Sequence, residues 1–124
     1  MFAATSTDKA PAAIGPYSQA IRYGNVLYTS GQIPLNPATG EVSGKTMAEQ
    51  AEMAIRNLLA VLEANGMGFE NIMKTTCFIT DMAEFGAFNE VYAKHFVSKP
   101  ARSCVEVSKL PKGVLCEIEA IAAK

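Results

Sequence analysis

The chain contains no tryptophan, 1 histidine and 3 cysteines in 124 residues. Cys77, Cys104 and Cys116 are widely spaced and form no Cys-x-x-Cys pair, and His95 alone cannot complete a common zinc site with them. We therefore expect no metal. An odd number of cysteines without a pairing pattern is typical of reduced thiols, so we expect a cytoplasmic location.

Long apolar runs and blocks of like charge are also absent. No apolar segment approaches the ~20 residues that cross a bilayer, and residues 1–13 lack the basic and apolar regions of a secretory signal. The 11 basic and 12 acidic residues are mixed along the chain and give a net charge of -1. We therefore expect no membrane association, and nucleic acid is a poor candidate partner because no basic stripe faces a phosphate backbone.

The composition and the order of predicted elements indicate one globular domain over residues 1–124. Hydrophobic residues make up 49% of the chain and charged residues 19%, which allows an ordinary core. Helices are predicted over 46–65, where Thr46 and Glu49 form a capping box, and from Asp81 to Phe96. Strands are predicted over 17–23, 26–30, 72–80, 102–109 and 114–122. This order predicts an α+β fold with two helices on one face of a mixed sheet.

The predicted sheet has more apolar surface than two helices can cover. The strand over 72–80 carries apolar residues on both sides, with Ile72 and Phe78 on one of them, and the strand over 114–122 is similar. An apolar sheet face normally packs against something. Other copies of the chain could cover the second face, so we expect a homo-oligomer with sites where subunits meet.

The segment over residues 100–107 places an arginine on a predicted strand. Side chains alternate along a strand, so Arg102 and Cys104 share one face, while Val105 and Val107 are expected to face the core. The planar guanidinium of arginine matches a carboxylate through two parallel hydrogen bonds. We therefore hypothesise that Arg102 binds the carboxylate of a small substrate.

Two glutamates follow on the final predicted strand. Glu117 and Glu119 share one face of it, and a hairpin loop over 110–113 would place that strand beside Arg102. One interpretation is a pair of solvated carboxylates, one of them paired with Arg102. The other is that Glu117 orients or deprotonates a water molecule beside the guanidinium.

Further residues also allow a structural and a functional interpretation. Cys104 is a small pocket wall or, given a partner histidine, a nucleophile. Gly31 could expose a backbone N–H to an anion, and Tyr17 is either an aromatic at the edge of the core or a pocket lid. Asn89, expected away from the aromatic stripe of its helix, is either solvated or hydrogen-bonds into a cleft.

Five segments, in order, match a known family along nearly the whole chain: residues 13–20, 28–33, 74–76, 100–107 and 117–122. The Pro-Ala-Arg-Ser segment followed by the Glu-Ile-Glu-Ala segment is specific as a combination. On these residues the chain resembles the RidA (YjgF) family of reactive intermediate deaminases.

The resemblance implies a chorismate-mutase-like α+β fold, related to the ferredoxin-like folds and assembled as a homotrimer with three clefts between subunits. It also implies hydrolysis of 2-imino and enamine acids, such as 2-iminobutanoate and 2-iminopropanoate from pyridoxal-phosphate enzymes, to 2-oxo acids and ammonia. No cofactor is implied. By this resemblance Arg102 binds the substrate carboxylate and Glu117 helps to place the attacking water. The remaining pocket positions that match are Tyr17, Ser30, Gly31, Asn89 and Cys104.

Two other functions stay open at this point. Some members of the family are described as endoribonucleases or inhibitors of translation, although the balanced charge of this chain does not favour RNA. The same arginine pocket would also suit a non-catalytic binder of small 2-oxo acids.

Overall fold

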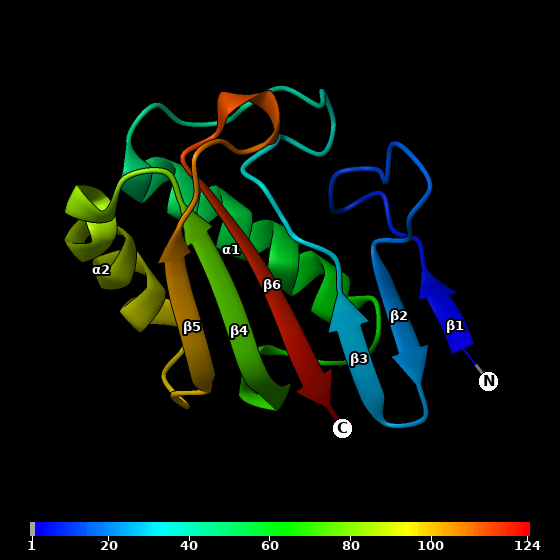
Figure 1. Cartoon of the computed structure of the whole chain (residues 1–124). Helices are drawn as coiled ribbons and strands as arrows, with labels where there is room; N and C mark the ends of the chain where they lie inside the picture. The colour runs from blue at the N-terminus through cyan, green and yellow to red at the C-terminus, as the bar shows by residue number, and fades with distance from the viewer. Residues whose placement is uncertain (1) are drawn as a thin grey trace.

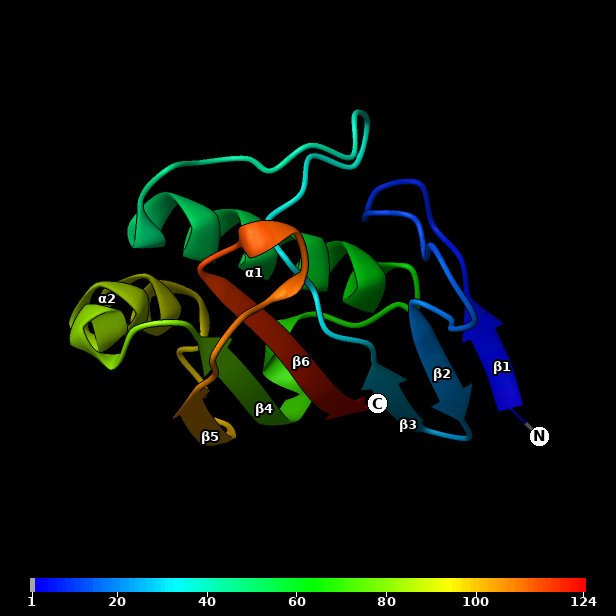
Figure 2. The same ribbon diagram turned by 45° about the horizontal axis from the view of Figure 1, so that its top comes forward.

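The computed structural model describes residues 2–124 as a six-stranded sheet with two helices on one face (Figure 1). The strands are β1 Phe2–Thr5, β2 Ala20–Tyr23, β3 Val26–Thr29, β4 Ile72–Ile79, β5 Ala101–Glu106 and β6 Cys116–Ala123, and the helices are α1 Met47–Glu63 and α2 Phe85–His95. The order across the sheet is β1-β2-β3-β6-β4-β5, in which β4 and β5 are parallel and the other pairs antiparallel. Figure 2 shows α1 and α2 on the same side of the sheet. The predicted α+β class is confirmed.

Local sequence signals account for both ends of α1. The Thr46 side chain accepts a hydrogen bond from the Glu49 N–H at 3.2 Å, and the Glu49 side chain accepts from the Thr46 N–H at 3.1 Å. This is the predicted capping box, which satisfies two backbone donors that the first turn leaves free. At the other end Gly66 has φ +70°, the left-handed conformation that glycine adopts without a steric penalty.

The second helix begins as predicted at Asp81, but its first turn is a separate 3-10 helix, Met82–Glu84. The Asp81 side chain accepts a hydrogen bond from the Ala83 N–H at 2.9 Å. The aromatic stripe of α2 then packs into the core, with Phe88, Tyr92 and Phe96 buried. The core therefore lies between this stripe, α1 and the helix-facing side of the sheet.

The strand order corrects one prediction. We expected the last two strands to form a hairpin, but β4 lies between β5 and β6 and pairs with both. Residues 107–115, which include the 3-10 helix Pro111–Gly113, carry the chain across the end of β4 (Figure 1). Strand β5 runs parallel to β4, and α2 supplies the crossover connection that a parallel pair requires. In the strand order β5 occupies the edge of the sheet.

The faces of β5 are also the reverse of those predicted. In the parallel register Arg102 is opposite Thr75 and Cys104 is opposite Cys77, and Thr75 and Cys77 are fully buried beneath the helices. Opposite residues of a ladder point to the same side, so Arg102 and Cys104 lie on the helix side. Val105, expected in the core, is 43% exposed. The alternation was predicted correctly, but the register with β4 decides which set faces inward.

The sheet face away from the helices, here called the open face, is rich in apolar side chains. It carries Tyr28, Met73, Phe78, Val105, Glu117, Glu119 and Ile121. A bulge between Ile72 and Lys74 shifts the alternation of β4. Ile72 therefore faces the helices, and Phe78 does not share its side as predicted. Tyr28 is 53% exposed and Met73 48%, so the apolar second face inferred from the sequence is present.

Strand β1 is an element that the sequence analysis missed. Its residues Phe2–Thr5 pair with β2 at the other edge of the sheet. The first predicted strand is correspondingly shorter, because regular pairing of β2 begins at Ala20 and not at Tyr17. Within residues 2–124, no helix is both long and apolar enough to span a bilayer.

Candidate active site

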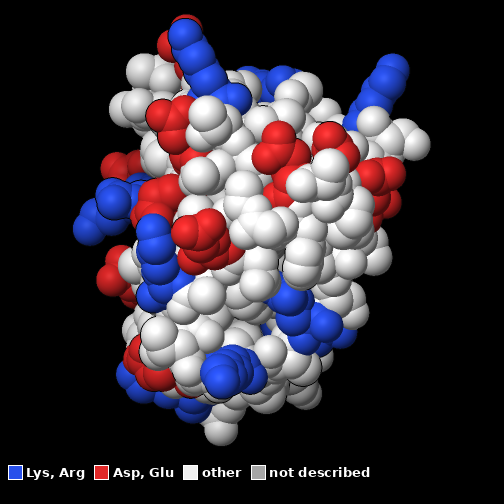
Figure 3. All heavy atoms as spheres, turned by 90° about the vertical axis from the view of Figure 1, so that its left-hand side faces the viewer, with Lys and Arg blue, Asp and Glu red and all other residues white. Residues whose placement is uncertain are grey.

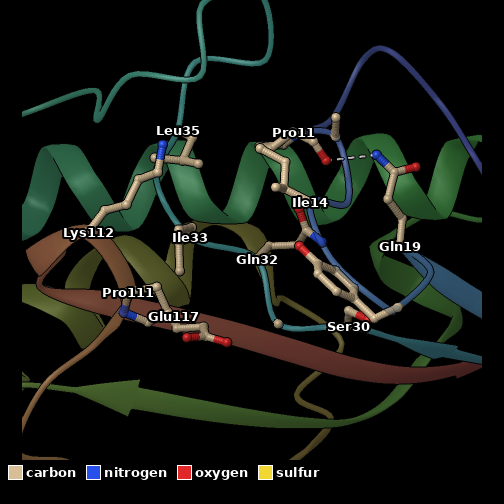
Figure 4. A pocket seen from close by; sticks show the side chains of 13 residues that line it. Pro11, Ile14, Gln19, Ser30, Gln32, Ile33, Leu35, Pro111, Lys112 and Glu117 are labelled. Carbon is tan, nitrogen blue, oxygen red and sulfur yellow. Dashed lines mark hydrogen bonds between the residues drawn. The ribbon is translucent and has the colours of Figure 1, made fainter.

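Two hollows contain most of the residues that the sequence analysis selected. The Arg102 hollow, about 650 Å³, is lined by Asn89, Tyr92, Ala93, Phe96, Val97, Lys99, Pro100 and Arg102. The Glu117 hollow, about 490 Å³, is lined by residues of the N-terminal segment, of the segment after β3 and of the loop before β6, together with Glu117 (Figure 4).

The Arg102 guanidinium is held by one amide and two aromatic rings. Its Nη1 donates a hydrogen bond to Asn89 Oδ1 at 2.6 Å. The guanidinium carbon lies 4.6 Å from the centre of the Tyr92 ring and 5.4 Å from that of Phe85, within the range of cation–π attraction. Among the described residues, no carboxylate forms an ion pair with it. A half-buried guanidinium oriented in this way keeps donors available for an anion.

The aromatic support of Arg102 is itself anchored in the core. The Tyr92 hydroxyl and Thr75 Oγ1 are 2.7 Å apart, and Thr75 is fully buried on β4. Burial raises the pKa of Tyr92, so its hydroxyl stays protonated at neutral pH. Tyr92 therefore presents a neutral, fixed ring to the guanidinium.

Asn89 corrects the prediction that it lies away from the aromatic stripe. Phe85, Asn89 and Tyr92 are spaced i, i+4 and i+7 along α2, and this spacing places them on one helix face. All three contact Arg102. The spacing would have been visible in the sequence, but the arginine that they surround comes from another element.

Cys104 lies two residues beyond Arg102 and packs partly buried against the core. Burial raises the pKa of its thiol, although the charge of Arg102 acts in the opposite direction. A protonated thiol is a weak nucleophile. His95 is engaged elsewhere, with its Nε2 2.9 Å from Glu52 Oε1, so the structure does not support the nucleophile interpretation of Cys104. Cys104 is not among the residues that line the Arg102 hollow or the Glu117 hollow.

The Glu117 hollow depends on a close approach between Glu117 and Gly31. A Cβ atom built on Gly31 would overlap the Glu117 carboxyl group, so only glycine leaves room for the carboxylate there. Burial raises the pKa of Glu117 above the ordinary value of 4.5, and the charge of Glu119 raises it further. Glu117 is therefore a stronger base than a solvated glutamate.

Tyr17 and Ser30 complete this hollow in different ways. Tyr17 lines it and is 53% exposed, which is consistent with a lid and not with an aromatic at the edge of the core. Ser30 donates its hydroxyl to the Ser18 carbonyl oxygen at 2.6 Å. The Ser30 hydroxyl thus fixes the loop that carries Tyr17.

A single chain does not bring the two hollows together, and this corrects the expected proximity of Glu117 and Arg102. Glu117 is opposite Phe78 on the open face, whereas Arg102 lies on the helix side of β5, with β4 between the two strands. An ion pair between Arg102 and either glutamate is excluded within the chain. Sequence analysis missed the residues Gln32, Phe85, Tyr92 and Lys112, which line these hollows or contact Arg102.

Metal ligands do not gather at either hollow. Across residues 2–124, no three histidine, cysteine or acidic side chains lie close enough together to hold a metal ion.

The fold and the two hollows define a small α+β domain with an arginine at one edge and a partly buried glutamate on the open face. Within residues 2–124 this arginine has no carboxylate partner. The family described as Endoribonuclease L-PSP matches residues 7–124. The chain therefore belongs to this family, and the resemblance to RidA (YjgF) proteins is confirmed.

Three relatives illustrate the similarity. A RutC family protein of Pyrococcus horikoshii is 51% identical over 119 residues, which cover 95% of this chain and 94% of that protein. The 2-iminobutanoate/2-iminopropanoate deaminase of Escherichia coli is 49% identical over 123 residues, 96% of this chain and 95% of that protein. The crystal structure of E. coli TdcF with bound serine has a TM-score of 0.94 and 44% identity, and the match covers 98% of each chain.

Proposed function

We propose that the protein hydrolyses 2-imino acids, such as 2-iminobutanoate and 2-iminopropanoate, to 2-oxo acids and ammonia. The observation that carries this proposal is the unpaired guanidinium of Arg102, oriented by Asn89 and backed by the Tyr92 ring. Such a group suits the carboxylate of a small organic acid. The deaminase name of the E. coli relative, 49% identical over most of both chains, supports the same substrate class.

We infer that the working site forms between chains of a homotrimer. The Arg102 hollow of one chain would meet the Glu117 hollow of the next, since one chain holds them on different faces of its sheet. The apolar open face, with Tyr28, Met73 and Val105 each at least 43% exposed, supports burial against other copies. In this arrangement Arg102 is the carboxylate anchor and Glu117 is the base, with Tyr17, Ser30, Gly31, Asn89 and Cys104 around them.

The chemistry needs one base and one anchored substrate. Arg102 binds the carboxylate and holds the imine carbon next to a water molecule. Glu117 accepts a proton as the water oxygen bonds to that carbon, and the π electrons of the C=N bond move to nitrogen. Glu117 returns that proton to the nitrogen, which gives a carbinolamine. The proton of the new hydroxyl group then passes through Glu117 to the amino nitrogen, the C–N bond breaks as the C=O bond forms, and ammonia leaves. Imine and water thus give 2-oxo acid and ammonia, and Glu117 ends unchanged.

The test is the rate at which 2-oxobutanoate forms when threonine dehydratase generates the imine in place. We expect Arg102→Ala to lose about 100-fold or more of the acceleration, because anchoring and orientation are lost. Arg102→Lys keeps the charge but not the planar fork, so it should retain only part of the activity. An Arg102→Ala variant with wild-type activity would contradict the proposal.

The alternatives give different results in parallel assays. An endoribonuclease, as the family description suggests, would cleave labelled RNA, and its binding would weaken steeply with salt. The face that carries α2 and β5 shows acidic and basic side chains interspersed, with no continuous basic patch (Figure 3), which does not favour RNA. A non-catalytic binder would bind 2-oxobutanoate without accelerating imine loss.

A further inference from the structure

Strand β5 is joined to the region around the start of α2 by a second residue besides Arg102. Glu106 is opposite Ile79, which is fully buried in the core, so the Glu106 side chain lies on the same side of β5 as Arg102. Its Oε1 accepts a hydrogen bond from the Met82 N–H at 2.7 Å. Met82 begins the 3-10 helix that leads into α2. Glu106 therefore ties β5 to the start of this helical segment.

This hydrogen bond is part of a closed ring of contacts that includes Arg102. The Phe85 N–H donates to the Met82 carbonyl oxygen, which fixes the first residue of α2 relative to Met82. The Phe85 ring in turn lies 5.4 Å from the guanidinium carbon of Arg102. The ring runs from Glu106 through Met82 and Phe85 to Arg102, and it closes along β5. A change at Glu106 therefore reaches the group that we propose as the substrate anchor.

The place of β5 in the sheet gives this tie its importance. Within residues 2–124, β5 pairs with β4 alone, and α2 lies alongside it (Figure 1). Contacts with the helical segment therefore supply the remaining restraint on this edge strand. A carboxylate that accepts from a backbone N–H forms a stronger hydrogen bond than a neutral acceptor. Its negative charge is also favourable where the first N–H groups of a helix have no partner within the helix.

We propose that Glu106 is a positioning residue for Arg102, an inference that rests on the anchoring role of Arg102 in the proposed function. Glu106 lines neither hollow, so it acts through other residues. It keeps the start of α2 against β5, and the Phe85 ring and the Asn89 amide then stay where they orient the guanidinium. Loss of this tie weakens carboxylate binding. It leaves the proton transfers unchanged, because Glu117 lies on the other side of the sheet.

Substitutions of two carboxylates separate this role from the stability of the 3-10 helix. Glu106→Ala should raise the Kd of 2-oxobutanoate, measured by calorimetry, about 3- to 10-fold, the effect of one hydrogen bond, while kcat stays unchanged. Glu106→Gln keeps an acceptor oxygen and should restore most of the affinity. Asp81→Ala is the matched control, because Asp81 accepts from the Ala83 N–H of the same 3-10 helix but, within residues 2–124, makes no hydrogen bond to β5. It should lower the melting temperature and leave the Kd in place.

A measurement on the wild-type protein is independent of whether the variants fold. Coupling between two contacts is reciprocal, so a ligand bound at Arg102 must stabilise the hydrogen bond between Glu106 and Met82. Hydrogen exchange of the Met82 backbone amide, followed by NMR, should therefore slow about 3- to 10-fold at saturating 2-oxobutanoate, the same factor as the change in Kd. The Ala83 amide is the control, because it donates to Asp81 and not to β5, and its exchange rate should stay unchanged.

The outcomes separate the inference from the proposed function. If the wild-type protein hydrolyses imines and Glu106→Ala keeps the wild-type Kd, the role of Glu106 is overturned and the proposed function stands. A Met82 amide that exchanges at the same rate with and without 2-oxobutanoate overturns that role as well. An Asp81→Ala variant that loses as much affinity as Glu106→Ala also overturns it, because the effect then belongs to the stability of the 3-10 helix. A wild-type protein that neither binds 2-oxobutanoate nor hydrolyses imines overturns both.

Discussion

Replacing Gly31 by alanine tests the position of the Glu117 carboxylate, the proposed general base. The new methyl group would occupy the space of the Glu117 carboxyl. Gly31 does not have positive φ, so alanine fits its backbone, and the lower entropy of the unfolded chain offsets part of the steric cost. We therefore expect the free energy of unfolding to change by no more than about 1 kcal/mol, the size of a strained rotamer.

The effect on catalysis should be far larger. If Glu117 is displaced from the water that it activates, the general-base contribution of about 100-fold or more is lost from kcat. Imine hydrolysis in the coupled dehydratase assay measures this loss, and urea unfolding measures stability. Gly86→Ala on α2 is the matched control, because nothing lies within 4 Å of its added Cβ, and it should keep wild-type kcat.

A double-mutant cycle tests whether the Gly31 substitution acts through Glu117. In a Glu117→Ala background no carboxylate is left to displace, so adding Gly31→Ala should cost almost nothing further. If the Gly31 and Glu117 losses instead multiply, or if Gly31→Ala alone keeps wild-type kcat, the close approach of these two residues has no catalytic importance.

Two further predictions concern the Tyr92 hydroxyl group and the charge of Glu119 beside Glu117. Tyr92→Phe should lower the free energy of unfolding, measured in urea, by about 1–3 kcal/mol, because the buried Thr75 hydroxyl loses its hydrogen-bond partner. In a Thr75→Val background this loss of stability should largely disappear. A full loss of stability in that background would argue against the hydrogen bond. Because the pKa of Glu117 is raised, and the base must be ionised, kcat/KM should fall as pH decreases through a value above 4.5. Glu119→Gln removes the like charge and should move that limb to lower pH, whereas an unmoved limb would contradict this electrostatic coupling.

Elements with local signals could be predicted from the sequence. The capping box of Thr46 and Glu49, the left-handed Gly66 and the side-chain cap at Asp81 all depend on neighbours within a few residues. The shared face of Glu117 and Glu119 follows from alternation alone. These features appear in the structure where the sequence indicated them.

Predictions that depend on pairing between strands far apart in the sequence were wrong, and some site residues were missed. Arg102 was assigned to the outer face because two valines alternate with it, but buried Thr75 on β4 sets the register of β5. The position of β4 between β6 and β5, together with the opposite faces that Glu117 and Arg102 occupy, removes the expected proximity of these two residues. Residues that reach a site from another element, such as Tyr92 and Gln32, have no local signal that relates them to it.

The most direct test of a site shared between chains is complementation of two inactive variants. Arg102→Ala and Glu117→Ala chains are mixed in equal amounts under conditions that exchange subunits, and native mass spectrometry verifies mixed assemblies. In a ring of three chains, each mixed trimer contains one site with both groups intact, so imine hydrolysis should recover to about a quarter of the wild-type rate. Mixed trimers that stay as inactive as their parents would contradict the account.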